Sequence, residues 1–292
     1  MKRTRAEMAL VLNTLIWGST FVVVKDALRD VSPLLFLALR FTVAVLVLMV
    51  LFRGAWSHPR KARAALRGGI VCGVFLFAGY AFQTIGLQFT TAPKSAFLTG
   101  LATAAVPLLA ALVYKVRPRA AELAGVALAV TGMGLMTLQG ASPLSMGRGD
   151  LLTVCCAVAF AAHIVSLGHY SPEVSFEVLS VTQVATSAVL ALSMFWWAET
   201  PALSWRPAVW VAIVVTGVLA TALAFSIQAW AQQYTTATRT ALIFTLEPLF
   251  AWATSYVLAG ETLSGRGVAG ALLIVGGVLL VEMKPLKQQP HP

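Results

Sequence analysis

The sequence predicts an all-α integral membrane protein, whose ten transmembrane helices form two inverted five-helix repeats. The first reason is composition, because the 292 residues are 59% hydrophobic and only 11% charged, whereas soluble domains carry about 25% charged residues. The second reason is an internal repeat, in which residues 68–98 recur recognisably at 213–243. Lipid is therefore the main solvent of this chain, and helices satisfy its backbone polar groups there.

Ten apolar stretches approach the length of about 20 residues that a helix needs to cross a bilayer. They lie at 8–25, 34–52, 67–89, 94–115, 120–138, 149–168, 176–197, 208–233, 238–258 and 265–282. The longest connection joins the fifth stretch to the sixth. We therefore divide the chain into a first five-helix repeat at 1–140, a second at 149–284 and a short cytoplasmic tail at 285–292.

The repeat is clearest where residues 81–98 (AFQTIGLQFTTAPKSAFL) align with residues 226–243 (SIQAWAQQYTTATRTALI). Gln83 meets Gln228 in this alignment, and Lys94 meets Arg239. Because each copy holds five spans, an odd number, the second copy must cross the bilayer in the opposite direction. Inverted repeats of this kind are typical of transporters that work by alternating access.

Basic residues predict the orientation of the first half. One side of the membrane receives Lys2, Arg3, Arg5, Arg53, Arg60, Lys61, Arg63, Arg67, Lys115, Arg117 and Arg119. The other side receives only Lys25, Arg29, Lys94 and Arg148. Since positively charged loops stay in the cytoplasm, we expect both termini to be cytoplasmic, in the plasma membrane of a bacterium, its inner membrane. Loops also account for the net charge of +10, so no nucleic-acid partner is expected.

Two charged residues lie inside predicted spans, where a charge at the centre costs about 2.5–3.5 kcal/mol on insertion scales. Arg40 is about 9 Å from the outer end of its span, so it either reaches the surface or faces a cavity. Glu247 lies close to the midplane, directly before Pro248. Either it stays neutral and binds a neighbouring helix, or it faces a cavity and couples transport to protons; we favour the cavity. The sequence leaves open whether the two residues pair.

Uncharged polar residues in the spans are further candidates for substrate binding. Asn13 and Trp17 lie four positions apart, on one face of the first span. His163 and Gln183 are the corresponding candidates in the sixth and seventh spans. For each of these residues the alternative is a structural one, in which the side chain binds or packs against a neighbouring helix.

The repeat pairs carry more weight than the single residues. Gln83 is predicted near the outer end of the third span and Gln228 near the inner end of the eighth, and each has an aromatic residue one turn away, Tyr80 and Phe225. Inversion puts the two aromatic–glutamine pairs at mirrored depths, as expected if each closes one side of a central site. The alternative is that both pairs stabilise equivalent helix contacts, worth about 0.6 kcal/mol per hydrogen bond.

Four segments resemble the EamA branch of the drug/metabolite transporter superfamily. They are WGSTF at 17–21, LALRF at 37–41, LEPLFAWATSYVLAGE at 246–261 and the glycine-rich last span. The resemblance implies ten helices in two inverted repeats around a central cavity, with the fifth and tenth helices at the periphery. It also implies transport of small metabolites such as amino acids, commonly as export.

We therefore expect the protein to lie in the lipid bilayer and to be a secondary active transporter of a small amphipathic metabolite. The alternative is a membrane-embedded enzyme acting on a lipid or prenyl substrate, which would need a catalytic cluster. The four histidines show no HExxH spacing and the three cysteines no CxxC spacing, so no metal or cofactor is predicted. Glycine-rich fifth and tenth spans predict close helix packing, and they allow a homodimer without requiring one.

Overall fold

The structure, a computed structural model, describes residues 1–57, 59–115, 117–138, 146–260 and 262–282. The predicted tail at 285–292 lies outside this range. The described elements are α1 (Lys2–Ala27), α2 (Pro33–Leu51), η1 (Arg53–Ser57), α3 (Pro59–Gly86), α4 (Ala92–Gly100), α5 (Ala102–Tyr114), α6 (Ala120–Thr137), α7 (Arg148–Tyr170), α8 (Phe176–Ala198), α9 (Pro207–Gly217), η2 (Val218–Leu223), α10 (Ala224–Ala231), α11 (Ala237–Phe244), α12 (Glu247–Ala259) and α13 (Gly265–Glu282). Each predicted span thus corresponds to one helix or to consecutive shorter helices, which confirms the all-helical prediction.

Seven helical segments among the described residues are long and apolar enough to cross a membrane. They are Pro33–Leu51, Arg63–Gly86, Lys94–Tyr114, Ala120–Thr137, Arg148–Tyr170, Phe176–Ala198 and Pro207–Ala231. A shorter apolar helix covers Gly265–Val281. The ninth predicted span divides into α11 and α12, neither of which has the length of a full span. The protein is therefore a multi-pass membrane protein.

The fourth and ninth predicted spans are each interrupted near the middle. α4 and α5 meet at Leu101, and α11 and α12 are separated by Thr245 and Leu246. Before Pro248, the N–H groups of Thr245 and Leu246 donate to carbonyls three residues back, at 3.1 and 3.0 Å. Proline lacks an N–H, and its ring would clash with the carbonyl four residues earlier. That carbonyl belongs to Phe244, and α11 ends at this residue.

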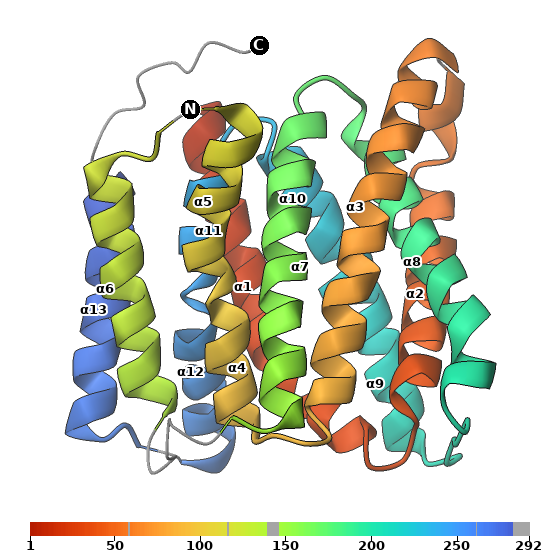
Figure 1. Ribbon diagram of the computed structural model, residues 1–292. Coiled ribbons are helices and arrows are strands. Elements are labelled where there is room, and N and C mark those ends of the chain that lie inside the picture. Colours follow the sequence, from red (N-terminus) through yellow and green to blue (C-terminus); the bar gives the residue numbers. More distant parts are fainter. Residues whose placement is uncertain (58, 116, 139–145, 261, 283–292) are drawn as a thin grey trace.

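Helices from the two halves of the chain alternate through the bundle (Figure 1). α1 packs on α10, α11 and α12, while α7 packs on α3, α4 and α5. α2 lies against α9 and η2, and α8 lies against α3. Each half therefore packs extensively against the other.

α6 and α13 form one edge of the bundle through reciprocal glycine contacts (Figure 1). A Cβ added to Gly132 would lie 2.5 Å from the carbonyl oxygen of Gly270, and a Cβ on Gly270 would lie 2.5 Å from that of Gly132. Gly125 and Gly277 make the equivalent pair, at 2.8 and 2.6 Å. The partners ascend on one helix and descend on the other, so α6 and α13 run antiparallel with their backbones in contact.

Candidate functional site

A cavity of about 180 Å³ lies inside the bundle and is lined by helices of both halves. Its described lining residues are Trp17, Thr20, Val24, Arg40, Tyr80, Gln83, Thr84, Leu87, Ala96, Thr99, Gly100, Ala102, Thr103, Met133, Phe160, His163, Ile164, Phe225, Gln228, Ala241, Phe244, Glu247, Pro248 and Ala251. α1, α3, α4, α7, α10 and α12 supply most of them, whereas none comes from α8, α9 or α13.

Most of the residues predicted to bind substrate come together at this cavity. The lining includes Trp17, Arg40, Tyr80, Gln83, His163, Phe225, Gln228 and Glu247. Asn13 and Gln183 are not among the lining residues, and both are fully buried. Asn13 Nδ2 donates to the carbonyl of Ala224 at 2.7 Å, which ties α1 to α10. Gln183 Oε1 lies 2.9 Å from His163 Nε2, so α8 holds the histidine from behind.

Aromatic rings form one wall of the cavity. The ring of Trp17 lies 5.5 Å from that of Phe225 and 4.9 Å from that of Phe244. Tyr80 lies 5.3 Å from Phe160 and 6.1 Å from Phe225. Ring pairs at such separations stabilise each other in edge-to-face or tilted arrangements. Sequence reasoning missed Phe160 and Phe244, because an aromatic residue in an apolar stretch does not differ visibly from a core residue.

Arg40 points into the bundle and does not reach the surface, since only 3% of the residue is exposed. Its Nε donates to Thr221 Oγ1 at 2.6 Å, and its Nη2 donates to the Tyr80 hydroxyl and the Ala220 carbonyl, both at 3.1 Å. The guanidinium also lies 4.5 Å from the centre of the Tyr80 ring. All of these partners are uncharged.

Glu247 begins α12 directly after the interruption and lines the same cavity. Gly18 lets α1 approach this point closely, because a Cβ there would lie 2.8 Å from the Glu247 carbonyl oxygen. Among the described residues, no hydrogen bond or ion pair engages the Glu247 carboxylate. The ion pairs of the described chain include none between Glu247 and Arg40, so the cavity carries an acid and a base that are not paired with each other.

The two glutamines of the repeat have different partners. Gln83 Nε2 donates to Thr99 Oγ1 at 3.3 Å, so it links α3 to α4. Gln228 Nε2 donates to Gln232 Oε1 at 3.1 Å, and Gln232 in turn donates to the Ile164 carbonyl at 2.9 Å. The Oε1 atom of Gln228 is buried without a hydrogen-bond partner in the described chain. It is therefore an unused hydrogen-bond acceptor on a residue that lines the cavity.

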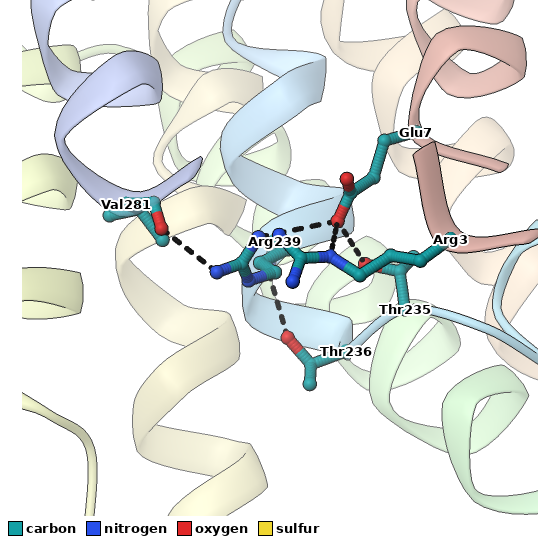
Figure 2. Close-up of polar contacts among 6 residues, drawn as sticks. All are labelled: Arg3, Glu7, Thr235, Thr236, Arg239 and Val281. Carbon is teal, nitrogen blue, oxygen red and sulfur yellow. Dashed lines mark hydrogen bonds and ion pairs between the residues drawn. The ribbon is translucent and has the colours of Figure 1, made fainter. Parts of the chain in front are cut away.

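A cluster of charged and hydroxyl groups joins the halves at the end of the bundle where α1 begins (Figure 2). Glu7 Oε1 accepts from Arg3 Nε at 2.8 Å, from Thr235 Oγ1 at 3.1 Å and from Arg239 Nη1 at 3.3 Å. Arg239 Nη2 also donates to the Val281 carbonyl, at 2.9 Å. This Glu7 cluster therefore connects α1 to α11 and α13.

A second cluster lies at the opposite end, where α4 and α7 begin (Figure 1). Asp150 Oδ2 accepts from Lys94 Nζ at 2.6 Å and from the Gly147 N–H at 2.8 Å. Asp150 Oδ1 accepts from Thr90 Oγ1 at 2.6 Å. This Asp150 cluster repeats the plan of the first, in which a threonine and a base from one half bind an acid from the first helix of the other half.

Among the described residues, no group of three or more His, Cys, Asp or Glu side chains lies close enough together to hold a metal ion.

Each half of the chain matches the same known protein family. The pattern of the EamA-like transporter family matches residues 4–138 and again residues 147–283. An "Uncharacterized transporter" of Archaeoglobus fulgidus is 34% identical over 97% of this chain and 88% of its own length. A "Probable amino-acid metabolite efflux pump" of Salmonella typhimurium is 28% identical over 96% and 95%. A "Probable terminal-alkyne amino-acid exporter" of Streptantibioticus cattleyicolor is 25% identical over 98% and 96%.

A solved crystal structure shares the fold. It superposes with a TM-score of 0.79 and covers 96% of each chain, at 20% sequence identity.

Proposed function

The chain belongs to the EamA-like transporter family, and we propose that it is a secondary active transporter that exports a small organic metabolite. The solute is an amino acid or a related amphipathic compound, and it crosses the bacterial inner membrane by alternating access. The observation that carries the proposal is the central cavity, which both halves line and which holds an acid, a base and several aromatic rings. Relatives named as amino-acid exporters support this solute class.

The proposed architecture is two five-helix repeats, at 1–140 and 149–284, that cross the membrane in opposite directions as ten spans. Two observations support it. The family pattern matches twice, and the antiparallel helices α6 and α13 are the fifth helix of each proposed repeat. In the repeat, Gly125 aligns with Gly270, and Gly132 aligns with Gly277. In the structure the contacts are crossed, because Gly125 packs on Gly277 and Gly132 packs on Gly270. A two-fold axis lying in the membrane plane produces such a reciprocal pattern.

The cavity residues divide into two kinds. Trp17, Tyr80 and Phe225 supply apolar surface for the solute, while Gln83 and Gln228 supply hydrogen bonds. His163 completes this set of cavity contacts. Asn13 and Gln183 do not line the cavity, and they act indirectly, because their hydrogen bonds hold α10 and His163 in place. Glu247 couples transport to protons, since it lines the cavity and its carboxylate has no partner among the described residues.

The two clusters at the ends of the bundle act as alternating closures. Each joins helices of different halves, and they lie at opposite ends of the bundle (Figure 1). Charge-assisted hydrogen bonds in a partly buried setting hold such contacts more firmly than neutral ones. When one cluster separates, the cavity opens toward that side while the other stays closed.

Transport is tested with purified protein in sealed proteoliposomes. Vesicles are loaded with a radiolabelled amino acid, and efflux is followed with and without an imposed pH gradient. We expect protein-dependent efflux of chemically unchanged amino acid. An enzyme would instead return a modified product, and no efflux of any amino acid would contradict the solute class.

The inverted arrangement is tested separately by cysteine labelling in whole cells. Arg29 lies after α1, with 76% of its side chain exposed, and Glu173 lies in the corresponding exposed turn after α7. A membrane-impermeant maleimide should label Arg29→Cys from outside but reach Glu173→Cys only after permeabilisation. Labelling of both from one side would rule out inversion. The same result reports the cytoplasmic location of the N-terminus.

A further inference from the structure

The segment η2 (Val218–Leu223) is a turn of π-helix between α9 and α10. At its end the N–H of Ala224 donates to the carbonyls of Leu219 and Thr221, and it passes over that of Ala220, four residues back. Thr221 Oγ1 donates to the Thr216 carbonyl, five residues back, at 2.9 Å. A helix that widens in this way leaves a carbonyl free to accept from outside, and such turns occur frequently at functional sites.

Comparison of the two copies indicates that η2 holds one additional residue. A Cβ on Gly73 would lie 2.5 Å from the Gln183 carbonyl oxygen, and a Cβ on Gly217 would lie 3.0 Å from that of Arg40. Gly73 and Gly217 thus make equivalent contacts at an offset of 144 positions, whereas beyond η2 the offset is 145, as for Gln83 and Gln228. The extra residue lies between these points, and its insertion explains why only this copy has a π-turn.

The freed carbonyl of Ala220 is used by two cavity residues. Trp17 Nε1 donates to it at 2.9 Å, and Arg40 Nη2 donates to it at 3.1 Å. Together with the bond from Arg40 Nε to Thr221 Oγ1, this fixes the guanidinium in one orientation. Gln183 occupies the corresponding place in the other copy and binds His163 instead. Among the described lining residues, Arg40 is the one lysine or arginine, and it lies on the wall that η2 supports.

The bonding of Arg40 is incomplete in two respects. Its described partners use Nε and Nη2, and they leave Nη1 without a protein acceptor. They also provide no negative charge, although a buried guanidinium without a counter-charge costs several kcal/mol. A planar guanidinium matches a carboxylate well, because two adjacent N–H groups can bind its two oxygens.

We propose that Arg40, held by η2, is a binding subsite for the carboxylate of the transported solute, and that Thr221 is its positioning residue. This inference rests on the proposed transport function and makes it more specific. The solute enters with its carboxylate toward Arg40 and its apolar part against the aromatic wall. In this orientation Glu247 lies near a cationic or proton-bearing group of the solute.

The test measures thermal stabilisation of the purified full chain in detergent. The probes are the aliphatic and aromatic L-amino acids, each compared with its own amide, which lacks the carboxylate. A bound ligand raises stability in proportion to the logarithm of its concentration over Kd. For the wild-type protein we expect the acids to bind at least about tenfold more tightly than the amides, the ratio expected from a hydrogen bond to a charged group.

Thr221→Val removes the hydroxyl at nearly constant volume, and Thr221→Ser keeps it as the matched control. We expect Thr221→Val to weaken binding of the acids by about tenfold, to leave the amides unchanged and to be rescued by Thr221→Ser. Equal binding of acid and amide by the wild-type protein would overturn the subsite without any variant. An equal loss for acid and amide in Thr221→Val would do the same. Binding of neither form would overturn the amino-acid part of the proposed function, and the subsite with it.

Discussion

Lys94 and Arg239 align with each other in the internal repeat, and each binds an acid supplied by the opposite half of the chain. Lys94 Nζ lies 2.6 Å from Asp150 Oδ2, and Arg239 Nη1 lies 3.3 Å from Glu7 Oε1. The two acids are at the beginnings of α7 and α1, so the pairs lie at opposite ends of the bundle (Figure 1). Equivalent contacts at the two ends are what two alternating closures require.

Asp150→Asn is predicted to favour opening of the cavity at the Lys94 end. The amide keeps some hydrogen bonds but loses the charge, and a loss of about 1 kcal/mol shifts an equilibrium by about fivefold. Cys156 reports this opening, because it is fully buried and its Sγ lies 3.8 Å from the cavity residue Thr99. We expect a soluble maleimide to label Cys156 about fivefold faster, as measured by peptide mass spectrometry.

Glu7→Gln is the matched control at the other end. It should leave labelling of Cys156 from the Lys94 side unchanged or slower, because it favours opening toward the opposite side. If both variants accelerate labelling equally, the clusters stabilise the fold in general and do not act as alternating closures.

Arg239→Lys is predicted to destabilise the protein, whereas Lys94→Arg should be tolerated. The guanidinium of Arg239 binds Glu7 through Nη1 and the Val281 carbonyl through Nη2. Lysine presents one compact ammonium group, which cannot reproduce this fork. We expect a loss of about 1–3 kcal/mol, the cost of leaving a buried group unsatisfied, visible as a lower Tm in detergent. A Tm equal to that of the wild-type protein would contradict the bridging role of Arg239.

Polar residues inside apolar stretches were the informative part of the sequence. Arg40, Glu247, Gln83 and Gln228 stand out because each would cost free energy in lipid, and all four line the cavity. The same contrast cannot separate a cavity residue from a structural one. Asn13 met the same criterion, but its side chain binds a backbone carbonyl away from the cavity.

Other parts of the site have no contrast that a single sequence could reveal. Phe160 and Phe244 lie among apolar residues, where an aromatic ring does not stand out from its sequence neighbours. Glu7 and Asp150 lie at helix ends, where acids are common. The π-turn of η2 depends on one inserted residue between two segments of weak similarity, and this insertion became visible only in the contacts of Gly73 and Gly217.

Glu247→Gln is predicted to uncouple transport from the pH gradient. Glutamine has nearly the same shape and keeps the cavity polar, but it cannot exchange a proton. In proteoliposomes we expect the variant to exchange labelled for unlabelled amino acid across the membrane, while an imposed pH gradient no longer drives net movement. Pro248 remains in place, so the interruption before α12 is preserved. Gradient-driven transport at the wild-type rate would exclude Glu247 as the coupling group.

Gly132→Ala is predicted to destabilise the contact between α6 and α13, whereas Gly276→Ala should not. A methyl group on Gly132 would lie 2.5 Å from the carbonyl oxygen of Gly270 and 2.9 Å from the backbone N of Ile274. Backbone atoms cannot rotate away, so the helices must separate, at a cost of about 1–3 kcal/mol. Gly276 lies on α13 as well, but nothing comes within 4 Å of a Cβ there.

The two variants separate packing from helix propensity, because alanine is more favourable than glycine in a helix by about 1 kcal/mol at both positions. Thermal unfolding in detergent should therefore show a lower Tm for Gly132→Ala and an unchanged or higher Tm for Gly276→Ala. Because α13 lines none of the described cavity and α6 contributes only Met133, the preference of Gly132→Ala among amino acids should stay that of the wild-type protein. A changed preference would mean that the α6–α13 pair takes part in solute recognition and does not act only as a support.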